Sequence, residues 1–131
     1  MLKQLTLANF RRIENDTMNF SEGLNVIRGD NEASKTTRIE SILYAFFGSK
    51  GLREPLAKVV TYDKPEASLK VELDFSYDGV DYRIKRGKSG AELTYGDQSV
   101  TGQTEVRVFC ERLFGCSADT AKQLVIADQN S

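Results

Sequence analysis

The amino-acid sequence predicts a mixed α/β fold, in which a strand-loop-helix unit is joined to an antiparallel β-sheet. Three observations support this prediction. An apolar run over 24–27 leads into a loop that begins at Gly29, and an amphipathic helical pattern over 39–47 follows. Apolar and charged residues alternate strictly over 69–75, which is the period of a half-exposed strand. From Thr101 the apolar spacing becomes helical again.

The elements before the sheet can be assigned in order. Strands are expected at 2–9, 17–20 and 23–28, where apolar residues alternate or cluster between turn residues. After the first helix, Gly48 is the residue type that ends a helix. The segment 49–65 contains both prolines and has no clear period, so we expect a loop with a short strand at Val59 and Val60.

The antiparallel part follows. The alternating strand at 69–75 turns at 77–80 into a second strand at 82–85, and a third strand near 92–95 precedes a turn at 96–97. A helix with Gly115 as its stop signal comes next. Its apolar positions are Val106, Phe109, Cys110, Leu113 and Phe114.

Composition limits the possible classes of protein. With 131 residues and 40% hydrophobic content, the chain fits one domain over 1–131. Its 18 basic and 19 acidic residues give no overall basic charge for nucleic acid. No apolar run approaches the roughly 20 residues of a membrane helix, so a cytoplasmic protein without membrane contact is expected. The chain has only two cysteines, Cys110 and Cys116, which are too few for a disulfide framework and, without any histidine, for a zinc site.

The loop at 29–36 has the form GxxxxGK[ST] in every position but one. Gly29 permits a sharp turn that directs successive backbone N–H groups at one anion. Lys35 is a mobile cation suited to β and γ phosphates, and the Thr36 hydroxyl is suited to Mg²⁺. The pattern therefore predicts a nucleoside triphosphate site. Its cofactor-binding residues are Gly29, Asp30, Asn31, Glu32, Ala33, Ser34, Lys35, Thr36 and Thr37, and Thr37 has no assigned chemical role.

Ser34 is the departure from the pattern, which has glycine before the lysine. A side chain there crowds the phosphates or strains the backbone, at a cost of about 1–3 kcal/mol. The alternative is an ordinary strand-turn-helix in which Gly29 and Lys35 occur by chance. The agreement of strand, loop ends and helix favours the phosphate loop.

Four segments resemble the N-terminal lobe of an ABC-class ATPase head of the SMC and SbcC kind, the chromosome-structure and DNA-repair ATPases. They are 5–11, 20–31, 39–48 and 80–86, and together the match extends over essentially the whole chain. This resemblance implies a P-loop NTPase lobe with an inserted antiparallel sheet, and it implies ATP and Mg²⁺ as cofactors.

The resemblance also implies roles for residues outside the loop. Arg11 and Arg12 stand where the family has basic residues near the nucleotide, although two adjacent arginines also suit a solvated turn. Gln129 matches the Q-loop glutamine, a catalytic residue that reaches Mg²⁺ and the γ-phosphate. A second interpretation of 124–128 is a Walker B strand that ends in Asp128, but Gln129 stands where a hydrolytic site has glutamate.

The resemblance implies the function of an SbcC-like DNA repair or recombination ATPase. Its partners would be a second ATPase head bound through ATP, an SbcD-like nuclease subunit and DNA. Because the chain has no signature motif, we expect a piece of a longer coiled-coil ATPase that hydrolyses ATP as a whole and negligibly as this lobe. The alternatives are a nucleotide sensor without turnover and another ABC-class ATPase such as a transporter subunit.

Overall fold

The computed structural model describes residues 2–20 and 32–120. The longer elements are β1 (Leu2–Phe10), β2 (Ile13–Asn19), α1 (Glu32–Phe47), β3 (Lys70–Tyr77), β4 (Val80–Gly87), β5 (Gly90–Tyr95), β6 (Gln98–Thr101) and α3 (Gln103–Phe114). Three short helices connect them: η2 (Gly48–Gly51), α2 (Leu56–Val59) and η3 (Glu66–Ser68).

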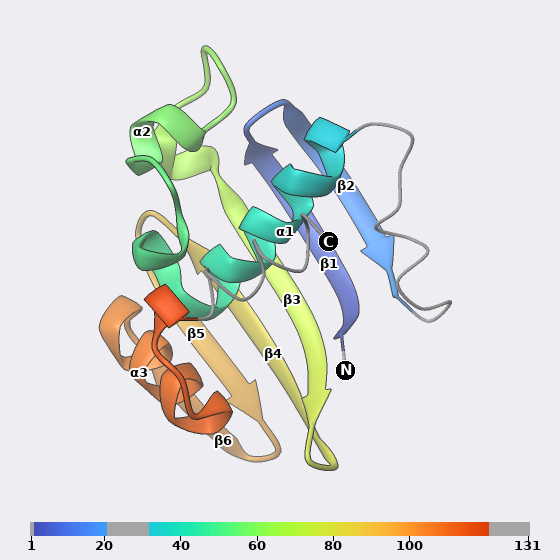
Figure 1. Ribbon diagram of the computed structural model, residues 1–131, viewed down its shortest axis with the longest axis vertical. Coiled ribbons are helices and arrows are strands. Elements are labelled where there is room, and N and C mark those ends of the chain that lie inside the picture. The colour runs from blue at the N-terminus through green and yellow to red at the C-terminus, as the bar shows by residue number, and fades with distance from the viewer. Residues whose placement is uncertain (1, 21–31, 121–131) are drawn as a thin grey trace.

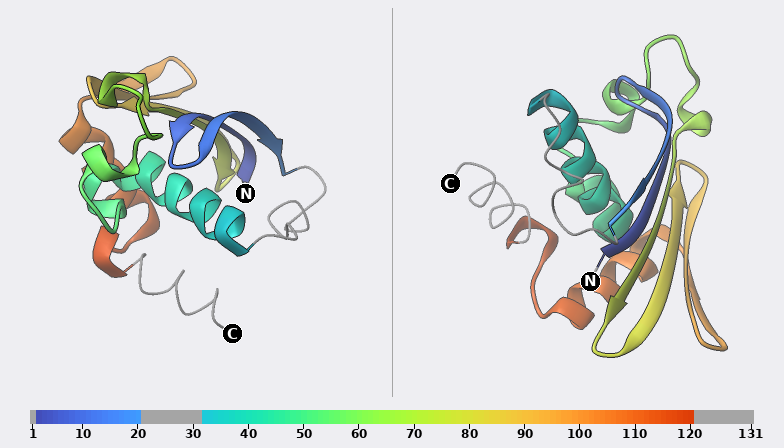
Figure 2. Two further views of the ribbon diagram at one scale, coloured as in Figure 1. Left: turned by 90° about the horizontal axis from the view of Figure 1, so that it is seen from above. Right: turned by 90° about the vertical axis from the view of Figure 1, so that its right-hand side faces the viewer.

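The six strands form one antiparallel sheet in the order β2-β1-β3-β4-β5-β6 (Figure 1). The strand β1 lies between β2 and β3, so that Leu5 is opposite Met18 on one side and Leu73 on the other. The helices α1 and α3 both cover the same face of the sheet (Figure 2). Alternate residues of β3 are buried beneath them, because successive side chains of a strand point to opposite faces. The prediction of a mixed α/β fold with an antiparallel sheet is confirmed.

An aromatic cluster joins α1, α3 and the sheet. Phe46 of α1 packs edge-on against Phe75 of β3, with ring centroids 5.1 Å apart, and against Phe114 of α3 at 4.9 Å. Phe75 stacks on Tyr82 of β4 at 5.0 Å. Such contacts bury large apolar surfaces in a fixed geometry, so both helices are anchored to the sheet by the same side chains.

Most strand and helix predictions are confirmed, with three differences. The second strand starts at Ile13 rather than at residue 17, because its polar first half pairs with β1 as far as Phe10. Val59 ends the short helix α2, and only Val60 makes a bridge, to Phe10. The strand β6 was not predicted. The predicted strand at 23–28 lies outside the described residues.

The helix ends behave as the sequence predicts. Gly48 and Gly115 follow α1 and α3 with φ of 68° and 72°, in the left-handed region that favours glycine. Cys110 is fully buried on α3, and burial raises its pKa to about 12, so its thiol is an unreactive part of the core. No helix within the described residues is both long and apolar enough to cross a membrane.

Candidate functional site

The phosphate-loop motif runs directly into α1. Residues 32–35 form the first turn of this helix, and Thr36 and Thr37 follow in the same helix. The N–H groups at a helix start have no partner within the helix, and the helix dipole places partial positive charge there. Gly29, Asp30, Asn31 and Gln129 lie outside the described residues.

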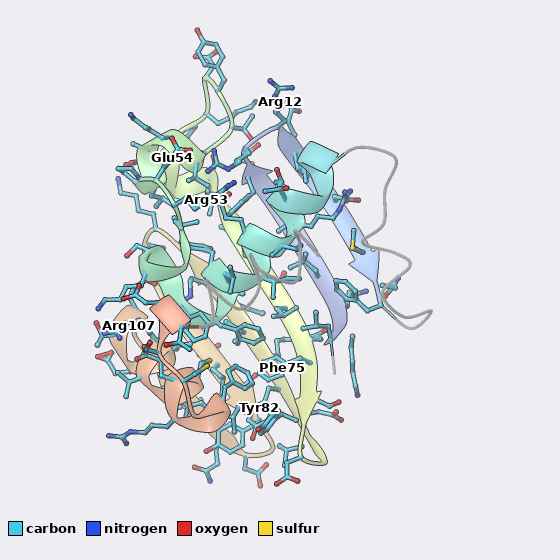
Figure 3. All side chains as sticks on the ribbon, viewed as in Figure 1. Arg12, Arg53, Glu54, Phe75, Tyr82 and Arg107 are labelled. Carbon is cyan, nitrogen blue, oxygen red and sulfur yellow. The ribbon has the colours of Figure 1, made fainter. Side chains whose placement is uncertain are left out.

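A cleft of about 700 Å³ opens beside the first half of α1. Thr37 lines it from α1, Arg12 from the turn between β1 and β2, Lys58 from α2, and Lys64 from the segment after α2. Figure 3 shows Arg12 close to the start of α1. The other lining residues are Arg11, Ala57, Val60, Thr61, Tyr62 and Asp63. Four basic residues and one acidic residue therefore surround this space.

Backbone contacts hold the basic turn against the segment after α2. Arg11 has φ of 52°, and its N–H donates to the Val59 carbonyl at 2.6 Å. The Thr61 N–H donates to the Asn9 carbonyl at 3.0 Å. These bonds flank the isolated antiparallel bridge between Phe10 and Val60. Tyr62 beyond them is 94% exposed.

The guanidinium of Arg11 is held by two carboxylates. Its Nε lies 2.6 Å from Glu40 Oε1, and its Nη2 lies 3.0 Å from Glu40 Oε2 and 2.9 Å from Glu54 Oε1. The pairing raises the pKa of Arg11, chiefly through the hydrogen bond with Glu40. Arg11 therefore lines the cleft, but its guanidinium is paired with Glu40 of α1 and with Glu54 after η2. Arg12, by contrast, is exposed.

Glu40 is the functional residue that sequence reasoning missed. Its side chain is only 4% exposed, and the Arg53 N–H also donates to Glu40 Oε2 at 3.3 Å. Burial alone would raise the pKa of Glu40, but the bonds from Arg11 and Arg53 outweigh burial and lower it. The available signal was a glutamate between Ile39 and Ser41, on the apolar side of the helix.

Arg38 connects α1 to the sheet. Its Nη2 lies 2.8 Å from Asp16 Oδ2 on β2. The Nε of Arg38 is buried and has no hydrogen-bond partner among the described residues. The middle of α1 is thus tied to β2 by Arg38 and to the turn after β1 by Glu40.

The structure brings together only part of the predicted site. Arg11, Arg12 and Thr37 line one cleft, and Thr36 precedes Thr37 in the same helix. Lys58 and Lys64 also line this cleft, although no motif in the sequence singles them out. No three His, Cys, Asp or Glu side chains are grouped as metal ligands in the part of the chain that the structure describes.

Comparison with known proteins gives a family. The model of the AAA domain family matches residues 4–130. The DNA double-strand break repair Rad50 ATPase of Archaeoglobus fulgidus is 34% identical over 112 residues, 86% of this chain and 12% of that protein. The Rad50 ATPase of Methanocaldococcus jannaschii is 33% identical over 97 residues, 71% of this chain and 9% of that protein.

A further relative is the DNA replication and repair protein RecF of Clostridium acetobutylicum. It is 31% identical over 97 residues, 70% of this chain and 26% of that protein. This chain therefore spans about a quarter or less of the length of these relatives. The predicted resemblance to an SMC and SbcC-type ATPase head is confirmed, and the chain belongs to the AAA domain family as a homologue of the Rad50 ATPases.

Proposed function

We propose that this chain, as a single domain over 1–131, is the ATP-binding lobe of a Rad50-like DNA-repair ATPase. The observation that carries the proposal is the basic cleft beside α1, whose first turn contains Ser34 and Lys35 of the phosphate-loop motif. The cleft volume of about 700 Å³ is within the range of small-molecule and cofactor sites. A nucleotide suits this space because its phosphates are anions and its base is largely apolar.

The basic residues of the loop and of the cleft have different roles toward the nucleotide. The loop N–H groups and Lys35 hold the β and γ phosphates at the helix start. Arg12, Lys58 and Lys64 are solvent-accessible cations that attract the rest of the nucleotide into the cleft. Arg11 has a positioning role, since its pairing with Glu40 and Glu54 fixes the wall of the cleft.

Mg²⁺ fits the donor chemistry of the motif. This ion prefers oxygen ligands and is usually bound by substrate phosphates with few protein groups. We assign the Thr36 hydroxyl and the Gln129 side-chain oxygen to it, with Gln129 in the Q-loop role. The ion would neutralise charge on the β and γ phosphates.

Titration of the chain with ATP, with and without Mg²⁺, tests the binding proposal by calorimetry. Lys35→Ala and Arg12→Gln should each weaken binding, the first by about tenfold or more because it removes the loop cation. Thr36→Ala should weaken only the Mg²⁺-dependent part. Arg112→Gln is the matched control, because it removes an exposed charge from α3, away from the cleft. Equal affinity in all four variants and in the unmodified chain would refute the nucleotide site.

The larger assembly is proposed from the relatives. They are named for DNA repair, so we infer that the full protein acts on DNA as a pair of heads joined through ATP, together with a separate SbcD-like nuclease subunit. ATP would clamp the heads, and hydrolysis would release them. Affinity purification of the full-length protein from its own cells, followed by an ATP-dependent nuclease assay on DNA, tests this part, and a pure ATPase without any co-purified nuclease would refute it.

A nucleotide sensor without turnover is a second candidate. Ser34 in place of the motif glycine is the observation that favours it, because a side chain beside the phosphates weakens their binding. Comparable affinity for ATP and ADP, together with no turnover by the full-length protein, would identify a sensor.

A further inference from the structure

A second basic cavity lies at the opposite end of α1. It has a volume of about 330 Å³, and the nearest residues of α1 that line the two spaces, Thr37 and Tyr44, are roughly 10 Å apart at about 1.5 Å per residue. The two spaces share no lining residue. The lining residues are Tyr44, Phe47, Gly48, Ser49, Lys50, Leu56, Arg86, Lys88, Gln103, Thr104 and Arg107. Four of them are basic and none is acidic.

Arg86 is the most deeply placed of the four cations. It is 2% exposed, and its guanidinium donates to the carbonyls of Ala45 at 3.0 Å and Phe46 at 3.4 Å and to Gln103 Oε1 at 2.6 Å. Nη1 also lies 3.4 Å from the Gln103 carbonyl. No carboxylate in 2–20 or 32–120 pairs with it. Burial lowers the pKa of Arg86 to about 10, as expected for a desolvated cation without an anionic partner.

Tyr44 supplies a neutral donor to the same cavity. It is 2% exposed, and the Arg86 guanidinium lies 6.0 Å from the centre of its ring. Its hydroxyl has no hydrogen bond within the described residues. The hydroxyl is not among the fully buried atoms that lack a partner, so it is accessible and available to donate to a ligand in the cavity.

The start of α3 adds positive potential. Gln103 and Thr104 are its first two residues and line the cavity, and no side chain caps the helix at Gly102. The free N–H groups and the dipole of this 12-residue helix favour an anion. Glu105 is acidic and lies in the first turn, with its carboxylate against Gly102 at the helix start and outside the cavity lining.

Three more basic side chains surround the opening. Lys88 pairs with Glu66 at 2.8 Å and Arg107 with Glu111 at 2.8 Å, and both carboxylates lie outside the lining. Lys50 has no ion pair in the part of the chain that the structure describes. Figure 3 shows Arg107 on α3, on the side that faces the end of α1.

We propose that this cavity binds a small oxyanion of the phosphate class. Its charged side chains are all cations, and its polar groups converge from the end of α1, from β4 and from the start of α3. The volume equals that of about ten water molecules at roughly 30 Å³ each, which suits one hydrated anion. An anion there would bridge the two helices and the sheet, in addition to the caps that Arg86 already provides for α1.

Amide NMR of the chain with inorganic phosphate tests the proposal. The chain carries Lys35→Ala so that the phosphate loop does not compete, and sodium chloride keeps the ionic strength constant. We expect saturable shifts of the Gln103 and Thr104 amide signals. The triple variant Lys50→Gln, Lys88→Gln, Arg107→Gln should weaken this binding by about tenfold or more. These three side chains are at the surface or half-buried, and Arg86 is left intact so that the variant keeps its fold.

The matched control removes the same charge elsewhere. Lys70→Gln, Lys85→Gln, Arg112→Gln neutralises three exposed cations outside the cavity and should change the affinity by less than about twofold. Unmoved Gln103 and Thr104 signals would refute the site and leave Arg86 as a helix cap alone. An equal loss in both triple variants would also refute it. Binding of a DNA duplex that needs Lys50, Lys88 and Arg107, without saturable phosphate binding, would replace the small anion with a polymer.

Discussion

Arg11 and Glu40 form a two-pronged ion pair that joins the turn after β1 to the middle of α1. The two bonds, at 2.6 and 3.0 Å, align the planar guanidinium with the carboxylate, and Glu40 is almost completely buried. Arg53 and Glu54 complete the cluster from the segment after η2. Three segments that are distant in sequence are therefore held by one cluster beside the proposed nucleotide cleft.

Replacement of Glu40 by glutamine should lower the free energy of unfolding by about 2 kcal/mol near neutral pH, because Arg11 loses the buried one of its two charged partners and keeps only the half-exposed Glu54. The control is Glu72→Gln, whose exposed pair with Lys85 spans 3.8 Å and should contribute less than about 0.5 kcal/mol. Chemical denaturation measures both. A change of the same small size in both variants would contradict the prediction.

The same pair predicts a pH dependence. The folded-state pKa of Glu40 lies below its ordinary value of 4.5, because the bonds from Arg11 and Arg53 outweigh burial. Its contribution to stability is therefore complete above the unfolded pKa and is lost as the pH falls through the folded one. The difference in melting temperature between the unmodified chain and Glu40→Gln should shrink below pH 4.5. A constant difference from neutral to acidic pH would refute this.

Gly48→Ala should destabilise the chain more than Gly79→Ala. Both glycines have positive φ, 68° and 82°, so both changes carry backbone strain of about 1 kcal/mol or more. Only at Gly48 would the new Cβ lie 2.7 Å from Arg86 Nη1, whereas nothing lies within 4 Å at Gly79. Displacement of the bonded guanidinium should add about 1 kcal/mol. Equal melting temperatures would show that Arg86 moves without cost.

Ser34→Gly should tighten ATP binding, because it removes the side chain that departs from the phosphate-loop pattern. The melting temperature of the free chain should stay level or fall, since glycine adds entropy to the unfolded state. Calorimetry and thermal denaturation of the same variant test both parts. Unchanged or weaker binding would mean that the loop accommodates serine, with its hydroxyl bonded to a phosphate.

The chain alone should hydrolyse ATP negligibly. Phosphoryl transfer depends on positioned charges around the transferred group, and a loop with Mg²⁺ supplies only part of them. Phosphate release should match a blank without protein, and the chain should remain a monomer in sizing experiments with a non-hydrolysable analogue. Steady turnover that disappears in Lys35→Ala would overturn this and would give Asp128 the role of a Walker B residue.

The sequence predicts the local elements well, because their signals repeat within a few residues. The alternation over 69–75 places Val71 and Leu73 on the buried face of β3, as the structure shows. The helical spacing after Thr101 likewise places Val106 and Cys110 in the core. The phosphate-loop motif is also local, so the sequence by itself identifies the class of ligand that we propose.

Only the tertiary structure decides which partner each element and each charge has. Residues 14–16 are all polar and carry no strand period, yet they belong to β2 and lie beside β1, because that side of β1 has no other strand. Arg11 and Arg12 are adjacent and chemically identical, but the fold places Glu40 and Glu54 beside Arg11 and leaves Arg12 at the open cleft. Lys58 and Lys64 reach that cleft because backbone bonds hold their segment against the turn after β1. Periodicity indicates which side of an element is buried. Ion pairs and clefts depend instead on contacts between residues far apart in sequence. Those contacts exist only once the sheet and α1 have packed together.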